Sequence, residues 1–310
     1  MIAPFPGAWE EIRNRNKVDK ILEECWKNPS AGYEIQPTDE WIVNNQQQQQ
    51  DGDRSDIIEQ DEFDAETTIA LGKPSTYGEI TPLGARQLFG AMGLFDYPRK
   101  QQRRPAHFFD LGSGTGKLVG QVVLELPNDT VERATGIELS PSRHESAIRA
   151  KEALMRWRRA NYQSEFTTLD YDNNDNNNNN NNINFLLSEE KIVHSTNKLE
   201  LLQDDLFDVD LSTATHIYVA SLCFPRNLML RLEERLRTLL QRQEQRSDDD
   251  AMDDDGEKDC LLQWVATLQP FPNNLGGIRP TIRFMEMSWT KPLGCAVYLY
   301  RCSSIRNDNR

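Results

Sequence analysis

The stretch Phe108-Phe109-Asp110-Leu111-Gly112-Ser113-Gly114-Thr115-Gly116-Lys117 decides the fold of this chain. An apolar run ends at Asp110, three glycines follow within five residues, and an amphipathic run occupies residues 118–126. This order predicts a buried strand, a glycine turn and a helix. A turn that holds a ligand against backbone amides needs glycine, because a Cβ atom would fill the space and some positions require positive φ. The stretch therefore predicts a nucleotide-binding pocket.

The spacing of the glycines separates three kinds of nucleotide-binding loop. A P-loop needs a glycine five residues before Gly116 and Ser or Thr after Lys117, but the chain has Leu111 and Leu118 there. A dinucleotide-binding loop needs its third glycine at position 117, which is lysine. The G-x-G-x-G pattern, with an acid two positions before it, is typical of class I methyltransferases that use S-adenosylmethionine. The cofactor-binding residues predicted in this loop are Asp110, Gly112, Gly114, Gly116 and Lys117.

Two later strands end in acidic residues. A strand over residues 133–137 ends in Glu138, 22 residues after Gly116, where a carboxylate can accept hydrogen bonds from both ribose hydroxyls. The alternative for Glu138 is a solvated glutamate at a strand end. A strand over residues 199–203 leads into Asp205-Leu206. In methyltransferases of this class such an acid takes the adenine amino group and its apolar neighbour lies against the ring; the alternative for Asp205 is a cap on the following turn.

The remaining segments complete an α/β sheet. Residues 215–220 form a predicted fourth strand, after which Ser221 and Phe224 are expected to face the site. A helix over residues 226–243, a fifth strand within residues 261–268 and a closing hairpin of residues 282–289 and 296–302 follow. The predicted fold is a Rossmann-like, doubly wound α/β domain with a mostly parallel seven-stranded sheet and an antiparallel end.

Composition sets the class of protein. The 310 residues are 37% apolar and 27% charged, enough for one α/β domain of about 200 residues with extensions. The net charge of −14 lies entirely in two acidic runs, residues 51–66 and 244–259. Five cysteines without C-x-x-C spacing indicate reduced thiols, and neither a long apolar run nor a signal peptide is visible. We expect a soluble, non-secreted intracellular protein without a membrane association, in the nucleus or the cytoplasm.

The predicted organisation has four parts. Residues 1–45 form an N-terminal helical segment, with an amphipathic helix at residues 9–27 that docks on a neighbour. Residues 46–66 are a Gln-rich and acidic flexible linker. Residues 67–302 are the methyltransferase domain, with low-complexity insertions at residues 170–184 and 244–259, and residues 303–310 are a tail. Within the domain, Tyr77-Gly78-Glu79 lies on a loop before a helix that Thr81 caps and Pro82 begins.

Together these motifs resemble the disruptor-of-telomeric-silencing family, the non-SET methyltransferases that modify a lysine of a core histone. The resemblance covers about residues 74–302 and rests on Tyr77-Gly78-Glu79, the glycine loop, Glu138, Asp205 and Ser288-Trp289-Thr290-Lys291-Pro292. It implies that Tyr77 and Glu79 hold the methionine end of S-adenosylmethionine and that Trp289 helps to wall a lysine channel. Transfer from a sulfonium to a neutral amine needs in-line approach and exclusion of water, which suits an aromatic slot of Tyr77, Phe224 and Trp289.

The chain departs from the family in two places, at Ala220-Ser221, where the family has an asparagine pair, and at Lys117, where it has glutamine. The resemblance implies a core histone in the nucleosome as substrate and a nuclear location. Two short basic clusters, solvated faces or phosphate contacts, would serve for weak DNA binding: Arg99, Lys100, Arg103 and Arg104, and Arg156, Arg158 and Arg159. A methyltransferase of a non-histone protein and a catalytically silent cofactor-fold interaction module are the alternatives.

Overall fold

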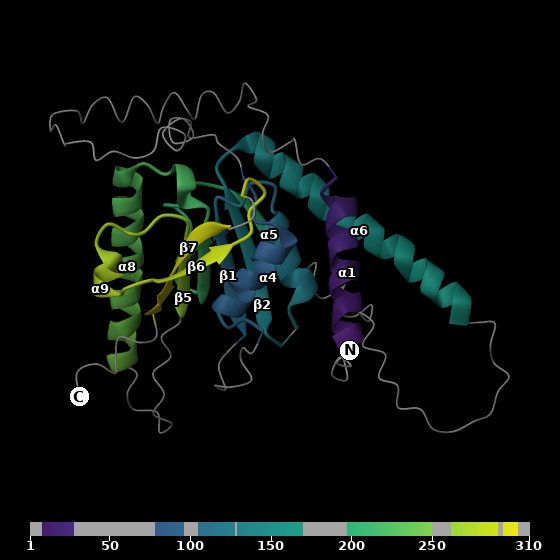
Figure 1. Ribbon diagram of the computed structural model, residues 1–310, viewed down its shortest axis with the longest axis horizontal. Coiled ribbons are helices and arrows are strands. Elements are labelled where there is room, and N and C mark those ends of the chain that lie inside the picture. The colour runs from purple at the N-terminus through teal and green to yellow at the C-terminus, as the bar shows by residue number, and fades with distance from the viewer. Residues whose placement is uncertain are drawn as a thin grey trace.

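A computed structural model of the protein describes residues 8–27, 78–95, 105–127, 129–169, 197–249, 262–290 and 294–302. Within these residues, one sheet of seven strands has the order β3-β2-β1-β4-β5-β7-β6 (Figure 1). The strands are β1 Ala106–Leu111, β2 Val131–Glu138, β3 Leu199–Gln203, β4 His216–Val219, β5 Trp264–Thr267, β6 Thr281–Met285 and β7 Cys295–Arg301. β7 runs antiparallel to both of its neighbours, and the other adjacent pairs are parallel. The predicted mostly parallel sheet with an antiparallel end is confirmed.

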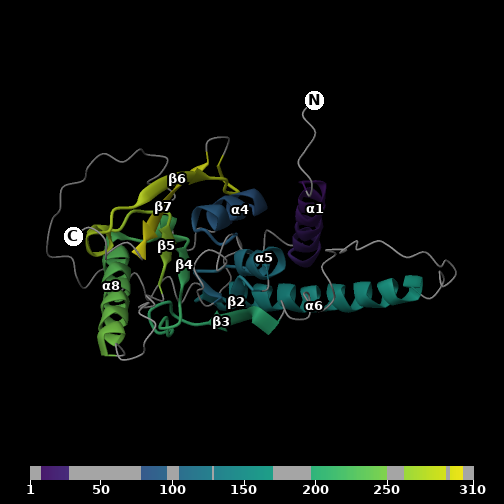
Figure 2. The ribbon, with the colours of Figure 1, turned by 90° about the horizontal axis from the view of Figure 1, so that it is seen from below.

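Helices cover both faces of the sheet (Figure 2). Leu88 and Phe89 of α4 and Leu118 of α5 pack on one face, while Leu232 and Leu236 of α8 pack on the other. The helices are α1 Ala8–Cys25, α4 Pro82–Ala91, α5 Lys117–Glu125, α6 Pro141–Leu169, α8 Arg226–Asp249, the 3₁₀ turn η2 Ser221–Cys223 and the single turn α9 Asn274–Gly277. Figures 1 and 2 agree that α6 projects away from the sheet beyond α1.

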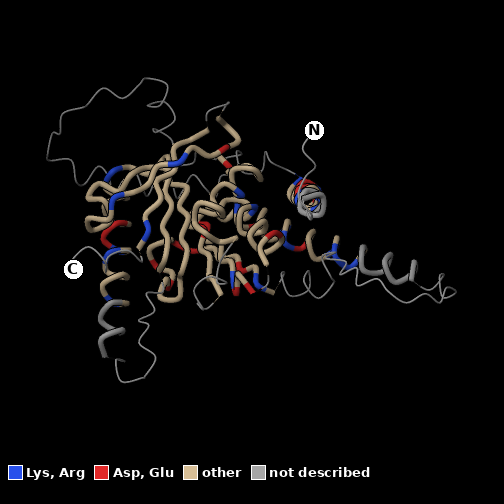
Figure 3. Tube along the Cα trace, turned by 60° about the horizontal axis from the view of Figure 1, so that its bottom comes forward, with Lys and Arg blue, Asp and Glu red and all other residues tan. Residues whose placement is uncertain are grey.

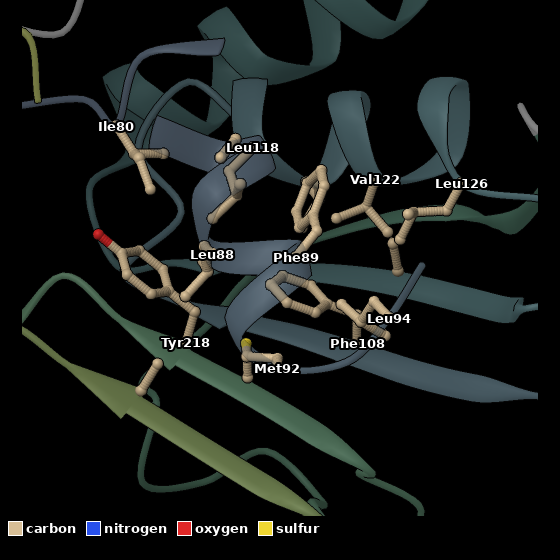
Figure 4. Packing of buried hydrophobic residues seen from close by; sticks show 14 of the residues in the cluster. Ile80, Leu88, Phe89, Met92, Leu94, Phe108, Leu118, Val122, Leu126 and Tyr218 are labelled. Atoms are coloured by element: carbon tan, nitrogen blue, oxygen red, sulfur yellow. The ribbon is translucent and has the colours of Figure 1, made fainter. Parts of the chain in front are cut away.

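Strand periodicity divides the core into two layers. Successive side chains of a strand point to opposite faces, so Phe108 joins the α4 and α5 layer and Phe109 joins the α8 layer. In the first layer the Phe89 and Phe108 rings meet edge to face, with 6.4 Å between their centroids and an interplanar angle of 86°. Figure 4 shows this layer and the hydroxyl of Tyr218, which is directed toward Ile80.

Local signals placed most element boundaries correctly. Thr81 caps α4 as predicted, because its hydroxyl accepts a hydrogen bond from the Gly84 N–H at 3.1 Å and Pro82 begins the helix. The first strand of the closing hairpin was predicted over residues 282–289 but ends at Met285. Residues 286–288 leave that strand and pair instead with residues 79–81, where Ile80 and Met287 form an antiparallel bridge.

Several predicted segments lie outside the described residues, among them the linker at residues 46–66, the insertion at residues 170–184 and the tail at residues 303–310. Among the helices that the structure describes, none has the length and apolar character needed to cross a bilayer. Figure 3 shows acidic and basic residues interspersed along α6, while the strands are mainly uncharged.

Candidate functional site

The glycine loop turns the chain from β1 across the end of β2. The N–H groups of Gly112 and Ser113 both donate to the Ile137 carbonyl, at 2.9 and 2.8 Å. Gly112, Gly114 and Gly116 all have positive φ, of 86°, 55° and 75°, which other residues rarely adopt. A Cβ atom added at Gly112 would meet nothing within 4 Å, so its backbone faces open space. The predicted glycine turn is therefore present, and it leaves open space beside Gly112.

Glu138 closes the loop from the end of β2. Its Oε2 accepts a hydrogen bond from the Gly114 N–H at 2.7 Å, and its Oε1 accepts one from the Ser140 N–H at 2.9 Å. The side chain is buried, with 6% of the residue exposed, so Glu138 is not the solvated strand-end glutamate that was the alternative. An ionised carboxylate has about four acceptor positions, so further donors such as ribose hydroxyls fit the same group.

Asp110 lies at the end of β1, buried to 3% exposure. Burial, followed by the charge of Glu138, raises the pKa of Asp110 from 3.8 to about 8. A cationic ligand nearby would favour its ionised form, which suits the charged methionine end of S-adenosylmethionine. Its register partner on β4 is Tyr218. Burial, followed by the charge of Asp110, raises the pKa of the Tyr218 hydroxyl. No motif in the sequence indicates that Tyr218 lies beside Asp110.

Glu79 connects the glycine loop to the segment after β6. Its Oε1 accepts a hydrogen bond from the Thr115 hydroxyl at 2.8 Å, and its Oε2 lies 3.6 Å from Lys117 Nζ. The Glu79 carbonyl accepts a bond from the Ser288 N–H at 2.8 Å, and the Glu79 N–H donates to the Ser288 hydroxyl at 3.2 Å. Glu79 therefore joins three segments that are far apart in the sequence.

Trp289 packs on Gly78, the residue before Glu79. A Cβ atom added at Gly78 would lie 2.2 Å from Trp289 Cζ3, so only glycine allows the indole to approach this closely. Trp289 remains 41% exposed. The structure thus brings together the two motifs assigned to the methionine end and to the lysine channel, while Tyr77 lies outside the described residues.

Asp205 and Leu206 follow β3, and both are half-buried. Asp205 Oδ1 accepts a hydrogen bond from the Phe207 N–H at 2.9 Å, which is the turn cap that the sequence left as an alternative. The Leu206 carbonyl accepts a hydrogen bond from Arg235 of α8. The position of Asp205 beyond the parallel strand end agrees with an adenine contact, but one of its oxygens already serves the turn.

The segment after β4 differs from the prediction. Ser221 has no exposed surface, and its hydroxyl accepts hydrogen bonds from the Leu268 and Gln269 N–H groups at 3.0 and 3.2 Å. The prediction that Ser221 faces the site is wrong, because this hydroxyl ties the end of β4 to the end of β5. Phe224 is half-buried beside it, and its carbonyl accepts a bond from Gln269 Nε2 at 3.3 Å.

Of the two predicted basic clusters, only the one on α6 lies within the described residues. Arg99, Lys100, Arg103 and Arg104 lie outside the described residues. On α6, Arg156 is exposed and lies 3.7 Å from the exposed Glu152, one helical turn away, which is the arrangement of a solvated helix face.

Sequence reasoning missed several residues that support the loop. Trp26, 89 residues before Thr115, donates its indole N–H to the Thr115 carbonyl at 2.8 Å. No spacing or motif predicts this contact. The hydrogen bond from the Ser140 N–H to the Glu138 carboxylate, in contrast, could have been expected from the turn before α6.

Comparison with known proteins finds no family model and no curated protein that matches the chain. Solved structures do match. An RNA methyltransferase from Salinibacter ruber has a TM-score of 0.36 and 16% identity, over 70% of this chain and 89% of that one. The rRNA methyltransferase aviRa from Streptomyces viridochromogenes has a TM-score of 0.37 and 11% identity, over 78% of this chain and 94% of that one. A magnesium protoporphyrin IX methyltransferase from Synechocystis PCC 6803 has a TM-score of 0.35 and 11% identity, over 86% of this chain and 97% of that one.

TM-scores of this size say nothing about a substrate. The fold is decided by the strand order, by the single antiparallel strand β7 and by the glycine turn after β1, with Asp110 and Glu138 at adjacent strand ends. The chain has the Rossmann-like α/β fold of the S-adenosylmethionine-dependent class I methyltransferases.

Proposed function

We propose that the protein is an S-adenosylmethionine-dependent methyltransferase of protein lysine, similar to the disruptor-of-telomeric-silencing family, with a core histone in the nucleosome as substrate. One observation carries this proposal. The carboxylate of Glu79 contacts the glycine loop through Thr115 and Lys117, while its backbone pairs with Ser288 beside Trp289. A cofactor-binding loop and an aromatic wall are thereby joined in one unit.

The predicted cofactor contacts fit the chemistry of the site. The open backbone at Gly112 has room for the ligand, Glu138 offers acceptors for ribose hydroxyls, and Glu79 and Asp110 supply carboxylates for a cationic methionine end. When bound, the cofactor supplies an activated methyl group on a sulfonium. Four carboxylates at four chain positions, Asp205 included, would have no common purpose in a silent module, which makes that alternative less attractive.

The acceptor side of the proposal rests on aromatic side chains. Trp289 lies against Gly78, and Phe224 follows the end of β4. Tyr77, the predicted third member, precedes Gly78 in the sequence. Such a slot would exclude water and orient the amine for in-line attack. A lysine that enters it is desolvated, which lowers the pKa of its ammonium group and favours the neutral nucleophile.

The choice of a histone over another protein depends on the family resemblance alone. A nuclear location and weak DNA contacts through residues 99–104 belong to the same proposal. The second candidate is methyl transfer to a non-histone protein, which the weak basic surface favours. The acidic runs at residues 51–66 and 244–259 would attract any basic partner, a histone surface included.

The test is transfer of labelled methyl groups from S-adenosylmethionine to nucleosomes, free histones and a cell extract. Glu138→Ala is the blank, because it removes the acceptor for the Gly114 and Ser140 amides and for the ribose. We expect the variant to lose measurable cofactor binding in calorimetry, a loss of at least about 100-fold for two or more charge-assisted hydrogen bonds. Glu132→Ala, an exposed position on the same strand, is the matched control and should bind normally.

The arms separate the candidates. Label in nucleosomal histone above the blank supports the first proposal, and label only in the extract moves the substrate to another protein. A wild-type protein that neither binds the cofactor nor transfers label in any arm would point to the silent module. Unchanged cofactor binding by a folded Glu138→Ala protein would refute the ribose assignment.

A further inference from the structure

The indole of Trp26, just after the end of α1, reaches the glycine loop from outside the sheet. Its Nε1–H donates a buried hydrogen bond of 2.8 Å to the Thr115 carbonyl. The ring also lies on the backbone of α5, because a Cβ atom added at Gly120 would be 2.5 Å from Trp26 Cη2. Glycine at position 120 is what permits this close approach.

A second device fixes α1 in the same place. Val18, Ile21 and Leu22 of α1 form a buried cluster with Leu124 of α5 and Leu154 of α6. These two helices follow the glycine loop and the Glu138 turn. The helix is thus docked on the elements that carry the cofactor-binding residues (Figure 2).

An ion-pair bridge adds to the docking of α1. The guanidinium of the half-buried Arg86 of α4 lies 2.7 Å from the Asp19 carboxylate of α1 and 2.5 Å from the Glu125 carboxylate of α5. One guanidinium on α4 therefore links this helix to α1 and α5 through ion pairs with two carboxylates.

Thr115 is the point at which this support meets the site. Its carbonyl accepts the Trp26 bond, and its hydroxyl donates to Glu79 at 2.8 Å. On one side of it the Gly114 N–H donates to Glu138, and on the other the Gly116 N–H donates to the Ser113 carbonyl. Rotation of the Thr115–Gly116 peptide would therefore disturb the loop backbone and the position of Glu79 together.

We propose that Trp26 is a positioning residue for the cofactor and that the docking of α1 is thermodynamically linked to cofactor binding. The inference rests on the proposed cofactor, S-adenosylmethionine or its product S-adenosylhomocysteine. If docked α1 holds the loop in its binding geometry, the cofactor must in return stabilise docked α1 by the same factor. The helix then supports the cofactor site through the contact of Trp26 with Thr115.

The test uses the full chain with Trp26→Phe, which retains an aromatic ring and removes the N–H donor. We expect the affinity for S-adenosylhomocysteine, measured by calorimetry, to fall about two- to tenfold, the value of one hydrogen bond. The matched control is Leu240→Ala, which removes packing of α8 on the other face of the sheet and touches neither α1 nor the loop. It should lower the melting temperature and keep the affinity within about twofold of the wild type.

The reciprocal effect is measured by amide hydrogen exchange. In the wild type, S-adenosylhomocysteine should increase protection of the α1 amides more than that of α8, which lies on the other face of the sheet. In Trp26→Phe the extra protection of α1 should shrink. If that variant does not fold, Gly120→Ala replaces it, because its Cβ displaces the indole and should cause the same loss.

The outcomes are distinct. A folded Trp26→Phe protein that binds S-adenosylhomocysteine as tightly as the wild type overturns the linkage and leaves the proposed function intact. Equal losses of affinity in Trp26→Phe and Leu240→Ala also overturn it, because the effect would then follow stability alone. A wild-type protein that does not bind S-adenosylhomocysteine overturns the proposed function and this inference with it.

Discussion

Asp110 and Glu138 end neighbouring parallel strands, but their surroundings differ. Glu138 accepts hydrogen bonds from two backbone amides, which favour the ionised carboxylate. Asp110 is enclosed by the sheet, and its burial together with the charge of Glu138 raises its pKa to about 8. A carboxyl group kept neutral near physiological pH costs little while it is buried, and it becomes an anion only when a cation compensates it.

This difference predicts a pH dependence of cofactor binding. A cation next to Asp110 favours its ionised form, so binding releases a proton while the pH is below about 8. We expect the affinity of the wild type for S-adenosylmethionine to rise between pH 6 and 8, by at most about tenfold per unit. Asp110→Asn should bind more weakly and with a flatter profile, whereas the exposed Asp129→Asn should behave as the wild type. Calorimetry over this pH range decides; parallel profiles for wild type and Asp110→Asn would contradict the assignment.

The same residue predicts a change in stability without ligand. The folded-state pKa of about 8 lies above the ordinary value of 3.8, so the folded state binds the extra proton between these pH values. The free energy of unfolding therefore falls as the pH rises through this window. Asp110→Asn removes the ionisation, and its melting temperature should exceed that of the wild type at pH 8.5 by several degrees, since each kcal/mol shifts the melting temperature by about 2–4 °C. At pH 4.5 the difference should be much smaller, and thermal melts at both pH values test this.

At the scale of elements, buried side chains fasten the ends of the strands. Ser221 joins the end of β4 to the end of β5, and Thr81 joins α4 to the segment after β6 through Glu286. On the other face, the buried Glu233 of α8 accepts hydrogen bonds from the Asn273 and Leu275 N–H groups and thereby holds the turn that contains α9. The Glu233 contacts lie on the face of the sheet that α8 covers, opposite α5.

Glu233→Ala should reduce stability and spare the cofactor site. Loss of the carboxylate leaves at least two backbone donors without this acceptor, which should lower the free energy of unfolding by about 2–4 kcal/mol. The neighbouring Glu234→Ala removes only an exposed ion pair with Arg237 and should leave the free energy of unfolding close to that of the wild type. Denaturant unfolding measures both, and cofactor affinity should remain that of the wild type. A large loss of affinity in Glu233→Ala would mean that this turn is coupled to the loop.

At the scale of the whole molecule, the described residues form one sheet with its helices, and the low-complexity segments are separate in sequence from the site. Residues 173–182 are nearly all asparagine, and the two acidic runs carry the net charge of −14. We expect deletion of residues 173–182 to leave methyl transfer and cofactor affinity unchanged, because such a segment has no apolar side chains to bury in the core. Comparison of turnover for the deleted and full chains tests this; a large loss would assign the insertion a part in substrate recognition.

The sequence by itself determined the strands, the glycine turn and the strand-end carboxylates. These depend on neighbours within one element: the apolar run before Asp110, the positive φ of Gly112 and the cap of Thr81 are all local. Only the tertiary structure decided which distant segments meet. The indole of Trp26 on Thr115, the pairing of Glu79 with Ser288 and the burial of Ser221 join residues that no local pattern relates. Such contacts follow from the packing of complete elements, and for that reason the cofactor half of the site was visible in the sequence and its support was not.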